Sequence, residues 1–363
     1  SVMFKENLAP LSAFDPGPSP EEIMKKYQLK RTIKLDSNEN VYGASPQVGK
    51  ALAQTNLQPA RYPDCRNQAL REALSVKLGV NENQFLFGLG LDEIIVLISR
   101  AFLDSASGIV MAWPTFYEYY SHAQIEGAET KKVPCDASGT HDLDAMLEAI
   151  DEKTKLVWIC NPNNPTGTCL PEHALRHFIE RVPANVIILI DEAYLEFTDP
   201  GERPDVLAIQ RQYSNVLVLR TFSKAYGLAS FRLGYAIGDP RLINELEKVR
   251  PPFNNPQISQ IAALAALSDE DFLHACVQKN KHVRDWTMRA LDQQGIAYYP
   301  TQTNFIFVKT EHAAEIAADL RTQGILINPF AHGLRITLGT KEEMEELVPL
   351  LAKALQKQPA EEI

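Results

Sequence analysis

The stretch "NVLVLRTFSKAYGLASFR" spans residues 215–232 and joins an apolar run to one lysine and one distant arginine. The first six residues are mostly apolar, which is typical of a strand buried on both faces of a parallel sheet. Lys224 follows that run closely, with the hydroxyls of Thr221 and Ser223 beside it. A lysine there is costly to bury unless its charge is paired or removed, for example as a Schiff base to a carbonyl cofactor. Taken alone, a lysine at this position is more typical of a surface loop.

Short apolar runs of the same kind recur along the first two thirds of the chain. Besides 215–220 they cover residues 85–87, 108–113, 129–133, 155–160, 185–191 and 233–237. Amphipathic patterns between them, for example at 91–102 and 143–151, predict helices. Alternation of strands and helices predicts a mostly parallel α/β sheet.

The pattern changes after Pro252 and predicts a second, smaller α+β domain. Helices are expected at 257–269, 272–295 and 341–357, and short strands at 297–300, 304–309, 325–330 and 334–339. We therefore expect a large domain at 46–255 and a small domain at 256–363. The Pro-rich residues 1–45 either lie across the surface or join the small domain.

Composition excludes several classes of function. The 363 residues are enough for about two domains, and a net charge of −10 argues against binding nucleic acid or an anionic membrane. The five cysteines form no C-x-x-C pair and no zinc-like cluster with histidine, so we expect reduced thiols and no metal site. No apolar run approaches about 18 residues, and no secretory signal pattern is visible. We expect a cytoplasmic protein.

Other predicted strands also end in polar side chains. "NVIILIDEAY" (185–194) ends in Asp191 and Tyr194. A carboxylate there can hold a pyridine nitrogen protonated, and a phenol can bond the ring's 3-oxygen. The alternative is an aspartate that caps the next helix. "NPNNPTG" (161–167) predicts a turn that presents Asn163 and Asn164, either as amide donors or only as part of that turn.

Two further strand ends suit a phosphate and a flat ring. "GLGLDE" (88–93) lies between a strand and a helix, whose N-terminus offers free N–H groups to a phosphate; Asp92 as a simple N-cap is the alternative. "WPTF" (113–116) places Phe116 where it stacks on a ring or packs in the core. Arg232 then suits the same phosphate. Pyridoxal 5′-phosphate is the ligand that matches all five strand ends.

These motifs together resemble the fold-type-I pyridoxal-phosphate-dependent aminotransferases. The resemblance rests on G-x-D-E, P-T-F, N-N-P-T-G, D-E-A-Y, S-K-x-Y-G-L-A-x-x-R and a late L-R-I-T-x-G, in that order. "SNEN" (37–40) and "RYPDC" (61–65) are similar to the histidinol-phosphate aminotransferase branch, which acts in histidine biosynthesis. The resemblance covers almost the whole chain. It implies a large domain with a seven-stranded, mostly parallel sheet and a smaller α+β domain.

The resemblance also implies roles for individual residues. Lys224 would bind the cofactor aldehyde and carry the proton in catalysis. The remaining cofactor contacts would come from Leu91, Asp92, Phe116, Asn164, Asp191, Tyr194, Ser223 and Arg232. Tyr62 would reach the cofactor phosphate of a second subunit, which implies a homodimer with shared sites. Arg335 would bind the anionic group of the substrate, with 2-oxoglutarate and glutamate as the second substrate pair.

Two positions depart from the pattern of the family. Phe14 stands where a tyrosine is usual, and Asn328 stands where an arginine is usual. Both changes remove groups that would contact the phosphate of histidinol phosphate, so an aromatic amino acid is an alternative donor. A threonine-phosphate decarboxylase would share the same motifs. A cofactor-binding regulatory domain would need a DNA-binding module, and a nicotinamide-dependent dehydrogenase would need a G-x-G-x-x-G after its first strand; we find neither.

Overall fold

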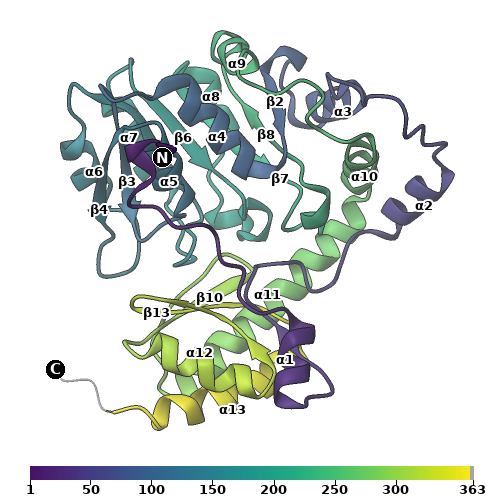
Figure 1. Ribbon diagram of the computed structural model, residues 1–363, viewed down its shortest axis with the longest axis vertical. Helices are drawn as coiled ribbons and strands as arrows, with labels where there is room; N and C mark the ends of the chain where they lie inside the picture. The colour runs from purple at the N-terminus through teal and green to yellow at the C-terminus, as the bar shows by residue number, and fades with distance from the viewer. Residues whose placement is uncertain (360–363) are drawn as a thin grey trace.

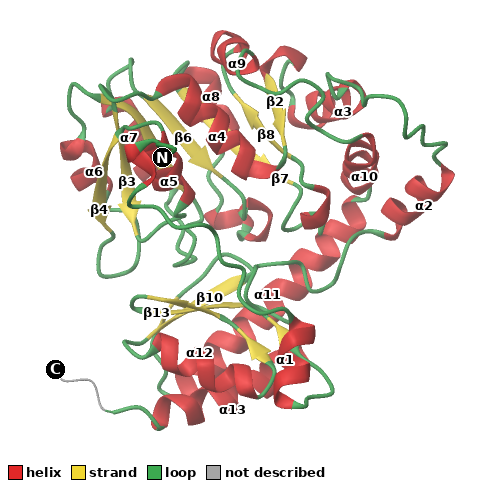
Figure 2. Cartoon of the chain, in the orientation of Figure 1, coloured by secondary structure: helices red, strands yellow, loops and turns green. Residues whose placement is uncertain are grey.

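The computed structural model describes residues 1–359 and is built around a seven-stranded sheet (Figures 1 and 2). Its strand order is β2-β8-β7-β6-β5-β3-β4, and β8 alone runs antiparallel to its neighbours. The strands are β2 (Phe85–Gly88), β3 (Gly108–Trp113), β4 (Glu129–Pro134), β5 (Thr154–Cys160), β6 (Ile187–Asp191), β7 (Val216–Thr221) and β8 (Gly234–Ile237). All seven predicted strands are present, and the α/β prediction is confirmed.

Helices cover both faces of this sheet, which explains why its central strands are apolar throughout. One face packs against α3 (Gln68–Leu78), α6 (Leu143–Ala149), α7 (Glu172–Arg181), α8 (Val206–Gln212) and α10 (Gln257–Ser268). The other packs against α4 (Gly90–Phe102), α5 (Glu118–Ile125) and α9 (Pro240–Glu247). Helix α2 (Pro46–Gln54) lies against α10.

The smaller domain is a four-stranded antiparallel sheet with helices on one side, as predicted. Its strand order is β12-β13-β10-β9, from β9 (Tyr298–Tyr299), β10 (Phe305–Lys309), β12 (Asn328–Phe330) and β13 (Gly333–Thr337). The helices are α11 (Glu270–Gln293), α12 (Ala313–Thr322) and α13 (Lys341–Gln356). The run predicted as one strand at 325–330 is divided, because β11 (Ile325–Leu326) leaves this sheet to pair with β1 (Ile33–Lys34).

The N-terminal residues do both things expected of them. The side chains of Lys5 and Asn7 donate to the carbonyl of Ile125 on the large domain, at 2.8 and 3.3 Å. Further on, α1 (Pro20–Tyr27) packs on α12, and β1 joins the small domain (Figure 1).

The expected division at residues 255 and 256 stays a prediction. Buried residues of α10, such as Ala262 and Ala266, belong to the core of the large sheet. Helix α11 then runs from the large body into the small one (Figure 1). This packing favours a boundary near Asp269, the N-cap of α11.

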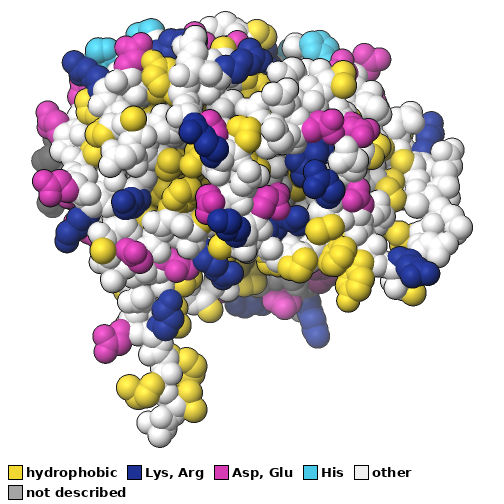
Figure 3. Space-filling model, turned by 90° about the horizontal axis from the view of Figure 1, so that it is seen from above, with side chains coloured by type: hydrophobic (Ala, Val, Ile, Leu, Met, Phe, Trp, Pro, Cys, Tyr) yellow, Lys and Arg dark blue, Asp and Glu magenta, His cyan; other side chains and the backbone are white. Residues whose placement is uncertain are grey.

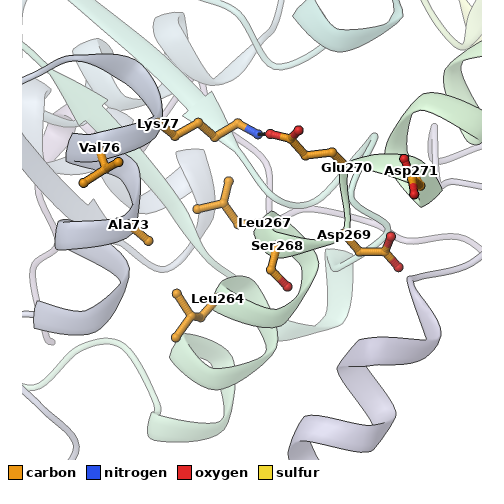
Figure 4. Close-up of a pocket in the computed structure, with 9 residues that line it drawn as sticks. All are labelled: Ala73, Val76, Lys77, Leu264, Leu267, Ser268, Asp269, Glu270 and Asp271. Atoms are coloured by element: carbon orange, nitrogen blue, oxygen red, sulfur yellow. Dashed lines mark hydrogen bonds and ion pairs between the residues drawn. The ribbon is translucent and has the colours of Figure 1, made fainter.

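One cavity among the described residues lies away from the strand ends. It measures about 610 Å³ and is lined by residues of α3, α10 and the start of α11, including Lys77 and Glu270, which pair at 2.7 Å (Figure 4). None of its lining residues is a predicted site residue. Across residues 1–359, no helix is long and apolar enough to cross a membrane.

Candidate active site

Lys224 lies just beyond the carboxyl end of β7, where parallel sheets place ligands. Its Nζ donates to the carbonyl of Ser37 at 3.2 Å and lies 5.8 Å from the centre of the Tyr194 ring. Burial lowers the pKa of Lys224 to about 8, and the charge of Arg335 acts in the same direction. The amine is therefore poised to lose its proton near neutral pH, as a nucleophile or a base requires.

Asp191 ends the neighbouring strand β6 and is 3% exposed. Its Oδ2 accepts from the phenol of Tyr119 at 2.5 Å, and its Oδ1 accepts from the N–H of Ala193 at 3.1 Å. Burial raises the pKa of Asp191 to about 6, although both of these hydrogen bonds lower it. Asp191 does not cap the next helical turn, Leu195–Phe197, whose N-cap is Tyr194 and which has no side-chain cap.

Tyr194 is held from the small-domain side by the "SNEN" segment. The amide of Asn38 donates to the Tyr194 hydroxyl at 2.9 Å, and the hydroxyl of Thr337 fixes the Asn38 amide oxygen at 3.1 Å. Burial raises the pKa of Tyr194 to about 12, so its phenol keeps its proton. Because its oxygen already accepts from Asn38, the proton of Tyr194 is free to be donated to a ligand.

The two asparagines of "NPNNPTG" have different roles. Asn163 has protein partners on both sides of its amide, since it accepts from Thr115 of the "WPTF" segment at 2.7 Å and donates to Thr166 at 2.9 Å. Asn164 accepts from Arg335 at 3.0 Å through its oxygen, which leaves its NH₂ group to donate. Of the pair, Asn164 is the one placed as an amide donor.

The predicted phosphate cradle is formed where α4 begins. No side chain caps this helix, whose first turn contains Leu91 and Asp92. The Arg232 guanidinium lies over Gly90, at which a Cβ atom would come within 2.7 Å of Nη2. Arg232 Nη2 pairs with Asp92 at 3.1 Å. The free N–H groups, the guanidinium and the close backbone approach together suit a phosphate.

An acid that sequence reasoning did not identify lies beside this cradle. Glu118 is the first residue of α5, and its Oε2 is buried without a hydrogen-bond partner among residues 1–359. Burial, the hydrogen bond with Asp92 and the charge of Asp92 raise the pKa of Glu118 to about 9. Glu118 is therefore uncharged at pH 7 and does not repel a phosphate.

Arg335 forms the link between the two domains. Besides Asn164, it donates to the carbonyl of Asp36 at 2.8 Å. With its amide oxygen turned toward the guanidinium, Asn328 accepts from Arg335 Nη2 at 3.1 Å, because the two residues lie opposite each other on β12 and β13. The Nε of Arg335 is buried without a partner among residues 1–359. A buried guanidinium N–H that lacks an acceptor suits an anionic ligand.

Phe116 packs beside Tyr119 at this centre, whereas two other predicted residues are exposed. Its ring meets Tyr119 edge to face, with centroids 5.6 Å apart, and Tyr119 in turn bonds Asp191. Phe14 is 90% exposed and Tyr62 is 81% exposed, stacked on Phe253 at 4.7 Å. Ser223 is buried and accepts from Thr221 at 3.0 Å. The roles of all these residues toward a cofactor stay predictions.

Sequence reasoning missed Asn38, Glu118 and Tyr119. The first lies in the "SNEN" motif, which had pointed to a family without showing a role. Glu118 and Tyr119 follow "WPTF" by two and three residues, at the start of a helix. Their closeness in sequence to Phe116 was the one sign that they could lie near the site.

Comparisons with known proteins agree with this geometry. The family model "Aminotransferase class I and II" matches residues 30–351. "Histidinol-phosphate aminotransferase 1" of Bacillus cereus is 47% identical over 99% of this chain and 98% of its own length. A crystal structure of histidinol-phosphate aminotransferase from Sinorhizobium meliloti in complex with pyridoxal-5′-phosphate has a TM-score of 0.88 and 28% identity, covering 97% of each chain. L-threonine-O-3-phosphate decarboxylase from Porphyromonas gingivalis shares the fold, with a TM-score of 0.79 and 21% identity. The chain belongs to the class I and II aminotransferases.

Proposed function

We propose that this aminotransferase uses pyridoxal 5′-phosphate to move an amino group from histidinol phosphate to 2-oxoglutarate. The observation that carries the proposal is the meeting of Lys224 and Asp191 at adjacent strand ends, beside an uncapped helix and Arg232. The donor set fits the cofactor group by group, with an amine for its aldehyde, an acid for its ring nitrogen and a cradle for its phosphate. Gly90 supports the fit, because any side chain there would fill the cradle.

Each side chain then has a distinct task. Bound pyridoxal phosphate would supply an electron-withdrawing ring next to the carbon that loses a proton. Lys224, with its pKa lowered to about 8, accepts and returns that proton. Tyr194 and Asn164 would donate hydrogen bonds to the ring 3-oxygen, and Arg232 with the first turn of α4 would hold the phosphate.

Arg335 is the candidate anchor for the anionic group of the donor. Its unpaired Nε points to one further acceptor, and Asn328 beside it brings no charge. Histidinol phosphate is supported by the relatives that carry that name, at 45% to 47% identity. An aromatic amino acid is favoured as a competing donor by Phe330, whose ring centre lies 5.5 Å from the Arg335 guanidinium, and by Phe307, which meets Phe330 edge to face.

The active unit is proposed to be a homodimer with shared sites. Tyr62 and Phe253 form a stacked pair that is 81% and 42% exposed, and Phe14 is 90% exposed. Figure 3 shows the N-terminal end of the chain as a projecting segment that carries hydrophobic side chains, in agreement with the exposure of Val2, Met3 and Phe4. A second copy of the chain would cover these surfaces and bring Tyr62 to the partner's phosphate cradle.

A panel of amino donors with 2-oxoglutarate tests the proposal. Glutamate formation would be measured with histidinol phosphate, phenylalanine, tyrosine and threonine phosphate, alongside carbon dioxide release from the last. Histidinol phosphate should give the highest kcat/KM. Glutamate formed only from aromatic donors would reject the proposed substrate, and carbon dioxide release without glutamate would reject transamination.

A further inference from the structure

The phenol of Tyr119 is buried and has one strong acceptor. Its side chain is 0% exposed, on the first turn of α5, and its hydroxyl donates to Asp191 Oδ2 at 2.5 Å. A buried phenol needs a hydrogen-bond partner, but a backbone carbonyl would be enough if Tyr119 served only to pack the core. The partner here is the acid that the site needs for the cofactor ring.

The Asp191 carboxylate is held at both oxygens. Oδ1 accepts from the N–H of Ala193 at 3.1 Å while Oδ2 accepts from Tyr119. Two donors on different oxygens restrict rotation about the last side-chain torsion, which is otherwise broad for aspartate. Each oxygen keeps one acceptor direction, so the carboxylate still has room for an N–H from a ligand.

The electrostatics of the pair favour a charged carboxylate and a neutral phenol. Burial raises the pKa of Asp191, and the hydrogen bond from Tyr119 opposes that rise. Burial and the charge of Asp191 place the pKa of Tyr119 well above its usual range. Among the other ionisable groups around Asp191, Asp92 opposes its ionisation and Lys224 favours it. The charge of Asp191 in turn raises the pKa values of Cys160, Glu118 and Tyr194.

The ring of Tyr119 is fixed by its aromatic neighbours. It stacks on Trp158 with centroids 4.3 Å apart and planes 9° apart, and it meets Phe116 at 82°. Tyr119 thus ties the predicted stacking residue to the predicted acid through one rigid side chain.

We propose that Tyr119 is a positioning residue of the cofactor site, which keeps the Asp191 carboxylate charged and oriented for the ring nitrogen of pyridoxal phosphate. The inference rests on the proposed function, because it needs that cofactor. Without the phenol, the proton between Asp191 and the ring nitrogen would move toward Asp191. The ring would then withdraw fewer electrons, and the nitrogen that joins Lys224 to the cofactor would become more basic.

The test compares Tyr119→Phe with Tyr120→Phe, which removes a hydroxyl from the next residue of the same helix. Tyr119→Phe should raise the dissociation constant for pyridoxal phosphate by about 10- to 100-fold, as expected for the loss of one charge-assisted hydrogen bond. The constant would be measured by titration of the protein fluorescence. Tyr119→Phe should also lower kcat and raise the pH midpoint of the visible absorption of the bound cofactor. Tyr120→Phe should match the wild type. A Tyr119→Phe protein with the wild-type pH midpoint and affinity would overturn the inference.

A double-mutant cycle separates positioning from a general packing role. In an Asp191→Asn background the phenol has no carboxylate to act on, so Tyr119→Phe should change the dissociation constant little. Equal losses in both backgrounds would overturn the inference, since they indicate packing. The double variant also removes the unsatisfied carboxylate, so it stays informative if Tyr119→Phe alone folds poorly. Wild-type protein that binds no pyridoxal phosphate would instead refute the proposed function.

Discussion

Asn328→Arg is the substitution that most directly addresses donor choice. Asn328 lies on the edge strand β12, opposite Arg335, with its amide oxygen 3.1 Å from Arg335 Nη2. Cβ atoms of residues opposite each other on antiparallel strands are about 5 Å apart. An arginine at 328 therefore places a second guanidinium beside the first, where both reach one phosphate.

The size of the effect follows from charge and hydrogen bonding. A phosphate monoester carries about 1.5 to 2 negative charges at pH 7 and a carboxylate about one, so the phosphate gains more from a second cation. One charge-assisted hydrogen bond contributes about 1.5–3 kcal/mol, or about 10- to 150-fold in affinity. Without an anion, two guanidinium charges about 6 Å apart repel each other by about 3 kcal/mol at an effective dielectric constant of about 20.

The assay is kcat/KM for histidinol phosphate and for phenylalanine, with 2-oxoglutarate saturating. Asn328→Arg should shift the ratio toward histidinol phosphate by about 10- to 150-fold. Asn328→Gln, which lengthens the side chain without charge, should leave the ratio near that of the wild type. An unchanged ratio for Asn328→Arg, or a shift toward phenylalanine, would refute the assignment of Arg335 and Asn328 to the substrate anion. A wild-type preference for histidinol phosphate above about a thousandfold, roughly 4 kcal/mol, would mean that another cation binds the phosphate.

Three further predictions concern charge and assembly. Lys224→Met should raise the thermal midpoint of the cofactor-free protein at pH 7, because it removes a buried charge. The Lys224 amine loses its proton near pH 8 in the folded chain and near pH 10.5 in the unfolded chain. The stability of the wild type should therefore rise between pH 8 and pH 10.5, and the advantage of the variant should disappear. A constant advantage across that range would contradict the lowered pKa of Lys224. Glu118→Gln should leave the dissociation constant for pyridoxal phosphate unchanged at pH 7, and above pH 9 only the wild type should bind less tightly, as its carboxyl ionises; tighter binding by the variant at pH 7 would show that Glu118 is charged there and repels the phosphate. Mixing Tyr62→Phe with Lys224→Ala protein should restore activity above that of either variant, and full activity of an isolated wild-type monomer would rule out shared sites.

The large sheet could be predicted because most residues in each of its central strands are apolar. Apart from the exposed Trp113 and Lys155, the runs at 108–113 and 155–160 are buried on both faces, so local composition already reveals the strand. The run at 325–330 was predicted as one strand, and it divides because β1, nearly 300 residues earlier in the chain, pairs with its first half. Pairing with so distant a segment leaves no local signal.

The site was predictable where the residue at a strand end carries the chemistry itself. Asp191 ends β6, and Lys224 and Asn164 lie a few residues beyond the ends of β7 and β5, which flank β6 in the sheet. The partners that orient them come from elsewhere in the chain. The hydrogen bond from Tyr119 to Asp191 spans 72 residues and that from Asn38 to Tyr194 spans 156, so neither periodicity nor spacing reveals them. Phe14 and Tyr62 are exposed in the single chain, and their predicted roles in the site stay predictions.

The central claim is that Lys224 holds pyridoxal phosphate, and chemical trapping tests it most directly. Purified protein loaded with the cofactor would be reduced with borohydride, digested and mapped by mass spectrometry. The added mass should lie on the peptide that contains Lys224, and Lys224→Ala protein treated in the same way should carry none. A label on any other lysine, or none on the wild type, would contradict the account.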